Sequence, residues 1–367
     1  MNSLEKMYLL ALQKANGIGD ITAKKLLQTC GSAEAIFKEK SSRLEKIYGI
    51  GKATLAGLKD QSLLRDSEKE FNFCTKNQID IFGFLDENYP EKLRHCPDGP
   101  ILIFSKGNIK FKEKKIISII GTRMMTNYGK SFLQEFMADI KHYDPLIISG
   151  LAYGVDIYAH QLAMKHNLQT VAVLAHGLDT IYPKVHQKYA LQLQENGGVI
   201  SEFWSKTNPD RENFIKRNRI VAGISEATVV IESAKKGGSL ITADIANSYN
   251  RDVFAVPGRS KDIFSQGCND LIKHNKAALL TSVKDLEYFL NWDMQHVSPK
   301  TIQKKLFIEL SETEQIIYQF LQQNGKQTLD LISLHCQIPI FKTAPVLLDL
   351  ELKGAVRPLP GKMFEAI

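Results

Sequence analysis

The central part of the chain repeats one pattern of hydrophobic and polar residues six times. Each repeat is a short, β-branched apolar run that ends abruptly in glycine, serine or a charged residue, and helix-length segments separate the runs. Such runs predict parallel strands that are buried on both faces of a sheet. The six predicted strands lie within residues 116–123, 146–156, 170–179, 198–202, 227–233 and 253–259.

Helices are predicted after the first five of these strands, over 127–142, 154–166, 183–196, 213–223 and 239–250. This alternation predicts the α/β fold class, with a Rossmann-like, doubly wound, mostly parallel sheet and right-handed crossovers. In such a sheet the ligand site lies outside the carboxyl ends of the strands. The small and charged residues that follow the strands are therefore the candidate site.

The N-terminal segment predicts short helices around two glycine hairpins, at residues 16–19 and 48–51. In a helix-hairpin-helix domain, backbone N–H groups at such a turn can face a phosphate oxygen, with Lys24, Lys25 and Lys52 as added charge. Packing of the helices alone is the other interpretation of the same hairpins.

The C-terminal segment predicts a winged-helix domain. Ser311, followed three residues later by Glu314, forms a capping box that begins a helix, and helix, turn, helix and hairpin follow. The helix over 342–353 carries few basic residues, which favours protein contact or a structural role over reading of a DNA groove. The predicted domains are a helix-hairpin-helix (SAM-like) domain at 1–65, an extended Rossmann-like domain at 66–295, a linker at 296–310 and the winged-helix domain at 311–367.

The composition narrows the class of protein only slightly. A formal net charge of +7 over 367 residues favours polyanionic partners without requiring one. Five widely separated cysteines without a Cys-x-x-Cys motif argue against a zinc site or a disulfide framework, so no metal is expected. The apolar patch near the start is too short for a signal peptide or a membrane span, and we expect reduced thiols in a cytosolic protein.

The first strand is followed by Gly121, Thr122 and Arg123, where a dinucleotide-binding protein would show G-x-G-x-x-G. Dinucleotide binding is therefore disfavoured. An arginine at this turn can hold a phosphate through two parallel hydrogen bonds. A salt bridge across the strand ends is the alternative interpretation.

A dense group of cations, amides and one aromatic ring begins the helix at 213–223. Phe214, Lys216, Arg217, Asn218 and Arg219 all lie in this short segment. Single-stranded nucleic acid needs such a mixture, because cations follow the backbone and a ring stacks on a base. If Arg217 points at the strand ends, Lys216 and Asn218 are expected on other faces of the helix. An ordinary charged helix start is the alternative.

Gly238 and Ser239 open another helix after a strand, so backbone N–H groups there can approach an anion. A Walker A motif is absent from the chain, which excludes ATP hydrolysis by that route. Asp156 and His160, four residues apart, could form an acid–base pair, but orientation of a glycine-rich loop is the favoured interpretation. We assign no catalytic residue.

Seven motifs in order carry a family resemblance. They are Gly121-Thr122-Arg123 with Tyr128-Gly129; residues 149–156 with Ala159-His160; residues 176–179 with Tyr182-Pro183; Ser201-Glu202; Phe214 with residues 217–219; residues 238–243; and Pro257-Gly258 with residues 267–272. Together they closely resemble the DNA-processing protein A family, also called DprA or Smf.

The resemblance implies a cytoplasmic, sequence-independent single-stranded DNA-binding protein that works as a homodimer without a cofactor. It implies protection of incoming DNA during natural transformation, and loading of the RecA recombinase in the presence of single-strand-binding protein. The implied DNA-binding residues are Gly121, Thr122, Arg123, Ser149, Gly150, Lys184, Phe214, Arg217, Asn218, Arg219, Gly238 and Ser239. Gly237, Lys216 and His186 depart from the common family pattern, which puts single contacts in doubt more than the fold.

A nucleotide-processing enzyme related to phosphoribohydrolases of similar architecture is the alternative function. Those enzymes carry a P-G-G-x-G-T-x-x-E loop. The corresponding residues are 236–244, where the proline, the third glycine, the threonine and the glutamate are all replaced. The alternative therefore rests on architecture more than on motif.

Overall fold

A computed structural model of the chain describes residues 1–112, 114–292, 310–359 and 363–366. The chain divides into two compact units, Met1–Leu290 and Asn291–Ile367. Almost all of the predicted linker, residues 296–310, lies outside the described residues. The domain boundaries derived from the sequence remain predictions.

A nine-stranded sheet lies at the centre of the first unit, in the order β1-β2-β6-β5-β4-β3-β7-β8-β9. The strands are β1 Asp80–Gly83, β2 Leu102–Gly107, β3 Ile116–Ile120, β4 Leu146–Ser149, β5 Thr170–Val173, β6 Gly197–Ser201, β7 Ala227–Val230, β8 Asp252–Ala255 and β9 Ala278–Leu279. All six predicted strands are present, and they pair in parallel from β6 to β8. Every residue of β3 to β7 is buried, which confirms the interpretation of the apolar runs.

The other three strands extend the sheet at its two edges. Strand β2 pairs antiparallel with β6 and with β1, and β9 pairs parallel with β8. Strands β1 and β2 were not predicted, because their runs are short and their antiparallel partners are not adjacent to them in the sequence. The two strands cover the β6 edge of the sheet.

The predicted helices are confirmed within a few residues. They are α8 Asn127–Ile140, α9 Val155–Lys165, α10 Gln187–Leu193, α11 Arg211–Ile224 and α12 Gly238–Ser248; α7 Glu91–Arg94, α13 Gln266–Lys273 and α14 Val283–Leu290 complete the set. Successive strands β3 to β6 extend the sheet in one direction, and β7 then pairs on the other side of β3. Right-handed crossovers therefore place α8, α9 and α10 over one face and α11 and α12 over the other. The topological switch point lies between β3 and β7.

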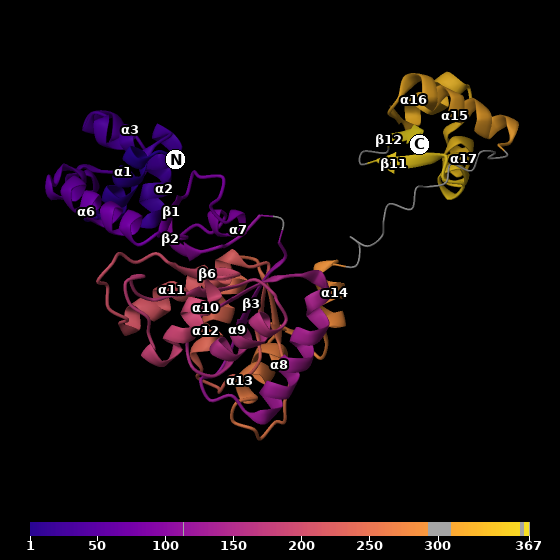
Figure 1. Ribbon diagram of the computed structural model, residues 1–367. Helices are drawn as coiled ribbons and strands as arrows, with labels where there is room; N and C mark the ends of the chain where they lie inside the picture. The colour runs from indigo at the N-terminus through magenta and orange to yellow at the C-terminus, as the bar shows by residue number, and fades with distance from the viewer. Residues whose placement is uncertain (113, 293–309, 360–362, 367) are drawn as a thin grey trace. The chain divides into compact units, whose positions relative to one another are not determined.

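Six helices form the N-terminal part of the same unit, and Figure 1 shows them gathered beside β1 and β2. They are α1 Ser3–Lys14, α2 Asp20–Cys30, α3 Ala33–Lys38, α4 Ser41–Leu44, α5 Lys52–Ala56 and α6 Ser62–Lys76. The predicted hairpins join α1 to α2 and α4 to α5, and Gly17 and Gly49 take left-handed backbone angles of φ 80° and 83°. Leu10, Leu26 and Leu102 belong to one apolar core, so these helices pack directly on the edge of the sheet.

The second unit is a winged helix. It contains α15 Glu312–Asn324, β10 Gln327–Thr328, α16 Leu329–Cys336, α17 Ile340–Leu352, β11 Val356–Leu359 and β12 Met363–Ala366. The predicted capping box is present, because Ser311 and Glu314 each accept a hydrogen bond from the other's backbone N–H. Helix α17 exposes Phe341, Leu348 and Leu352 and carries one basic residue, Lys342. This surface agrees with the prediction that α17 is poorly suited to a DNA groove.

No single helix among the described residues is long and apolar enough to cross a membrane; α16 and α17 meet the length and composition test only as a pair bent by 108°. The same residues contain no cluster of three or more histidine, cysteine, aspartate or glutamate side chains that could hold a metal ion. All five cysteines are free thiols.

Candidate functional site

A cavity of about 460 Å³ opens at the carboxyl ends of β3, β4 and β7. It therefore lies at the topological switch point, where ligands bind in open α/β sheets. Most of the residues implied by the family resemblance line it together: Gly121, Thr122, Arg123, Gly150, Phe214, Arg217, Asn218, Gly238 and Ser239. The fold thus brings together segments that are more than a hundred residues apart in the sequence.

Two further cations line the same cavity, Arg211 and Lys236, although the sequence analysis did not assign them. Both are exposed, as is Arg123, and none of the three forms an ion pair with any residue in the described parts of the chain. The helical period of α11 could have revealed Arg211, because residues 211, 214, 215 and 218 form one stripe and all face the cavity. The wall is therefore more cationic than the sequence analysis indicated.

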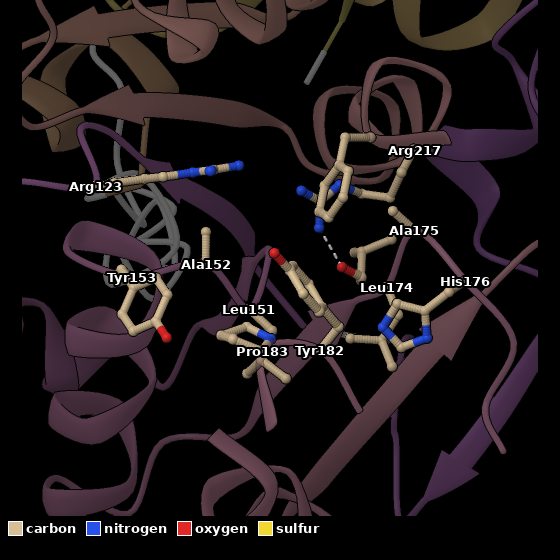
Figure 2. Close-up of a pocket in the computed structure, with 12 residues that line it drawn as sticks. Arg123, Leu151, Ala152, Tyr153, Leu174, Ala175, His176, Tyr182, Pro183 and Arg217 are labelled. Atoms are coloured by element: carbon tan, nitrogen blue, oxygen red, sulfur yellow. Dashed lines mark hydrogen bonds between the residues drawn. The ribbon is translucent and has the colours of Figure 1, made fainter. Parts of the chain in front are cut away.

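Arg217 is the buried cation of the cavity, with only 6% of its surface exposed. One terminal nitrogen donates a hydrogen bond to the carbonyl of Val173, at the end of β5, and Nε donates to Asn218 Oδ1 at 3.2 Å. Figure 2 shows the first of these hydrogen bonds as a dashed line from the Arg217 guanidinium. These bonds hold Arg217 in one orientation before any ligand binds.

The orientation of Asn218 corrects one detail of the sequence analysis. Asn218 lines the same cavity as Arg217, whereas Lys216 lines a different hollow and forms an ion pair with Glu202 at 3.2 Å. The prediction that both neighbours turn away was therefore right for Lys216 and wrong for Asn218. The hydrogen bond from Arg217 Nε pulls the short Asn218 side chain toward the cavity.

Asp156 supplies the one carboxyl group in the lining of this cavity. Burial raises its pKa, and the nearby Arg217 guanidinium acts in the opposite direction. Burial likewise lowers the pKa of Arg217, which Asp156 counteracts. Asp156 compensates the charge of Arg217, so the charges of Arg123, Arg211 and Lys236 remain uncompensated in the lining of the cavity. This positive charge favours the binding of an anion in the cavity.

The backbone of Gly150 lies close to the side chains of both Asp156 and Arg217. A Cβ atom at this position would lie 2.7 Å from Arg217 Nη1 and would also contact Asp156 Oδ2. Neither side chain can withdraw, because both are buried. The glycine is therefore needed for the close approach of these two groups to the backbone.

We expect Gly150→Ala to displace the Arg217 guanidinium and to destabilise the fold by about 1 to 3 kcal/mol, because the added methyl overpacks a buried site. A urea unfolding curve measures this cost. Gly238→Ala is the matched control, since a Cβ there meets nothing within 4 Å. Equal midpoints for the two variants would contradict the close packing around Gly150.

His160 and Asp156 orient the loop after β4, as the sequence analysis favoured. His160 is fully buried, and burial lowers its pKa to about 4, so the ring is neutral at pH 7. Its Nε2 lies 2.7 Å from the Gly150 carbonyl, which can only accept, so Nε2 carries the proton; Nδ1 lies 2.7 Å from Thr170 Oγ1. Asp156 accepts a hydrogen bond from the backbone N–H of Ala152 at 3.3 Å.

An aromatic wall borders the cavity. The guanidinium groups of Arg123 and Arg217 both lie over the Phe214 ring, with central carbons 6.0 and 5.8 Å from the ring centroid. Tyr182 packs edge-on against Phe214 with 6.0 Å between ring centroids. A smaller hollow continues from here and is lined by Tyr153, Tyr182 and Arg217, which Figure 2 labels. Rings and cations thus lie together along this edge.

Three of the residues implied by the family resemblance do not line the 460 Å³ cavity, which we call the main cavity. Ser149 is fully buried, and its hydroxyl donates to the carbonyl of Ile119 at 2.6 Å. Lys184 is exposed just beyond Pro183, which lines the smaller hollow. Arg219 lines another hollow and pairs with Asp20 and Glu202.

Lys24 corrects the expectation for the first hairpin. Its side chain is buried, and its Nζ donates to the carbonyl of Cys96 at 2.6 Å. Burial accordingly lowers its pKa. Lys24 therefore joins α2 to the loop after α7 and is not available to a phosphate, whereas Lys25 and Lys52 remain exposed.

The loop that corresponds to the phosphoribohydrolase motif differs in geometry as well as in sequence. Asp244 occupies the place of the motif's glutamate. Its carboxylate pairs with Lys276 at 2.9 Å and does not line the cavity. The acidic group that the alternative function would need is thus absent from the lining.

The fold and this cavity define a class of Rossmann-like proteins whose switch-point site combines cations, glycine backbone and an aromatic wall. Comparison with family models identifies the particular family. The model of DNA recombination-mediator protein A matches residues 80–291, and that of the DprA winged helix domain matches residues 308–362. The chain belongs to the DNA recombination-mediator protein A family, which confirms the resemblance to DprA and Smf.

Individual relatives agree with this assignment. Protein Smf of Synechocystis is 33% identical over 78% of this chain and 73% of its own length. The crystal structure of DprA from Streptococcus pneumoniae matches with a TM-score of 0.65 and 27% identity over 78% of this chain and 98% of that one. Helicobacter pylori DNA processing protein A, solved for its single-stranded DNA binding mode, matches with a TM-score of 0.53 and 28% identity over 59% of this chain and 97% of that one.

Proposed function

We propose that this protein binds single-stranded DNA independently of base sequence, and that the switch-point cavity is the binding site. The observation that carries the proposal is the arrangement of Arg217. Its guanidinium is buried, held by Val173 and Asn218, and lies over the Phe214 ring in a cavity with three cations that form no ion pair in the described parts of the chain. Sequence-independent binding needs this combination of backbone cations and a ring.

The chemistry of the lining supports phosphate and base contacts in one site. Arg123, Arg211 and Lys236 supply charge without ion-pair partners in the described residues. The N-terminus of α12, with Gly238 and Ser239 in the lining, adds backbone N–H groups and the positive end of the helix dipole. Contacts to phosphates carry no sequence information, so we propose no sequence preference.

The biological role that we propose follows the family. The relative from H. pylori is a single-stranded DNA-binding protein. We propose that this protein protects incoming single strands in the cytoplasm during natural transformation. We also propose that it helps to load RecA in the presence of single-strand-binding protein, and that these steps need no catalytic residue.

We further propose that the protein acts as a homodimer. Strand β9 is an edge of the sheet, and the neighbouring helix α14 exposes Tyr288 and Phe289. Leu279 of β9 is also half exposed. An unpaired edge strand beside exposed apolar side chains is a surface that a second copy can cover.

Binding is expected to weaken steeply as salt rises, because each neutralised phosphate releases counterions. If Arg123, Arg211, Arg217 and Lys236 each contact a phosphate, affinity for a single strand should fall roughly 50-fold between about 50 and 200 mM salt. A gel-shift titration with single- and double-stranded oligonucleotides across that range measures this effect. Affinity that is indifferent to salt, or a preference for the duplex, would contradict the proposal.

A further inference from the structure

A second hollow, of about 610 Å³, lies at the same edge of the sheet as the main cavity. It is lined by Tyr128, Pro257, Gly258, Arg259 and Asp262. Tyr128 belongs to the first turn of α8, and the other four residues belong to the loop after β8. None of these residues lines the main cavity.

The two hollows are bordered by neighbouring segments of the chain. Thr122 and Arg123, which line the main cavity, belong to the β3–α8 connection, and Tyr128 lies in the first turn of the helix that follows it. On the other side, Ser233 of the main cavity is joined to the loop after β8, since its N–H donates to the Phe264 carbonyl at 2.7 Å. Because β7 and β8 are adjacent and neighbouring strands lie about 4.8 Å apart, an extended chain leaving one hollow reaches the other within a few nucleotides.

Tyr128 presents a fixed aromatic surface in the second hollow. Its hydroxyl donates to the Pro257 carbonyl at 2.6 Å, and half of the residue remains exposed. The loop opposite is also held, because Asn269 exchanges two hydrogen bonds with the backbone of Gly258, at 3.2 and 3.0 Å. A ring with its polar end anchored and a face exposed can stack on a base at low cost in conformational entropy.

Cations without ion-pair partners in the described residues continue from the main cavity to this hollow. Lys235 and Lys236 follow β7, and Arg259 and Lys261 follow β8; all four are exposed. Asp262, the one acidic residue of the lining, would repel a phosphate placed against it. A phosphate is therefore expected beside Arg259 or Lys261.

We propose that single-stranded DNA leaving the switch-point cavity is held a second time, with one base stacked on Tyr128 and a neighbouring phosphate bound by Arg259. This inference rests on the proposed function, since it extends the same DNA strand. It predicts that affinity depends on the length of the DNA, because only a strand long enough to occupy both hollows gains the second contact.

Fluorescence anisotropy with oligothymidylates of about 4 and about 12 nucleotides tests this inference. Tyr128→Ala and Arg259→Ala should each weaken binding of the longer oligonucleotide roughly tenfold and leave that of the shorter one unchanged. Tyr128→Phe keeps the ring and should bind both like the wild type. Lys273→Ala, which removes an exposed cation of α13, is the charge control and should also bind both like the wild type.

The outcomes separate this inference from the proposed function. If the wild-type protein binds neither oligonucleotide, the proposed function itself is wrong. Normal binding of both lengths by Tyr128→Ala and Arg259→Ala, or an equal loss at both lengths, would overturn the second contact alone. If Tyr128→Ala does not fold, two other measurements decide. The first is the affinity of Arg259→Ala for the two oligonucleotides. The second is the fluorescence of 2-aminopurine placed at successive positions of the DNA, which a stacked ring should quench at one position in the wild type and in Tyr128→Phe alike.

Discussion

Arg217→Ala is expected to weaken binding of single-stranded DNA to any base sequence by roughly 10- to 100-fold. The variant loses a charge-assisted hydrogen bond to phosphate, which contributes about 1.5 to 3 kcal/mol. It also loses the guanidinium plane that packs on Phe214. Gel-shift titrations with oligonucleotides of several base compositions at one fixed salt concentration measure the effect.

Lys216→Ala is the matched control for this experiment. Lys216 is the neighbouring cation on α11, but its side chain lines a different hollow and pairs with Glu202. Its removal should leave affinity within about twofold of the wild type, because its charge lies outside the cavity and is screened by salt. Equal losses in the two variants would show that the charge of the helix matters and the cavity does not. A loss confined to one base composition would contradict contact with the DNA backbone.

Arg219→Ala should produce the largest loss of stability, about 3 to 5 kcal/mol, because it removes the buried one of the two cations that pair with the buried carboxylate of Glu202. The Arg219 guanidinium donates to Glu202, which is 2% exposed, and pairs with Asp20 at 3.1 Å. Asp20 begins α2, so this group joins the N-terminal helices to α11. Urea unfolding at pH 7.5 measures the loss.

The loss should become smaller in acid. Burial raises the pKa of Glu202, while Arg219 and Lys216 act in the opposite direction. Without Arg219 the pKa of Glu202 rises further in the folded state. Glu202 of the folded variant therefore stays protonated up to a higher pH than in the wild type. The stability deficit is therefore fully present above the variant's pKa and shrinks as the pH falls toward the pKa of the wild-type group. Unfolding curves between about pH 4.5 and pH 7.5 follow the change.

A double variant separates charge from packing. Arg219→Met combined with Glu202→Gln removes both charges and keeps most of the volume, so it should recover much of the stability. A deficit in Arg219→Ala that is independent of pH and remains in the double variant would contradict the role of the buried ion pair.

Much of the fold could be predicted because its signals are local. Apolar runs such as Ile116–Ile120 are buried on both faces wherever they are placed in a parallel sheet. The caps are local too, since Ser311 and Glu314 are three residues apart. Strands β1 and β2 were missed because their apolar runs are short, and β2 pairs antiparallel with β6, nearly a hundred positions away.

The candidate site was predicted less completely than the fold. Arg123 and Arg217 were found because each stands close to a strand end or in a dense basic segment. Arg211 was missed, although it lies on the same helical stripe as Phe214. Lys24 appeared to be a free cation in the sequence, and only its burial against the Cys96 carbonyl shows otherwise.

The sequence by itself determined the order of strands and helices, and with it the edge of the sheet where the site lies. Only the tertiary structure decided which cations at that edge share a cavity. Arg217 and Arg219 are two residues apart on one helix, yet the first lines the switch-point cavity and the second joins two parts of the fold. The reason is that a helix turns by about 100° per residue, so these side chains point in nearly opposite directions. Packing of α11 between the sheet and the N-terminal helices then decides which of them meets the cavity.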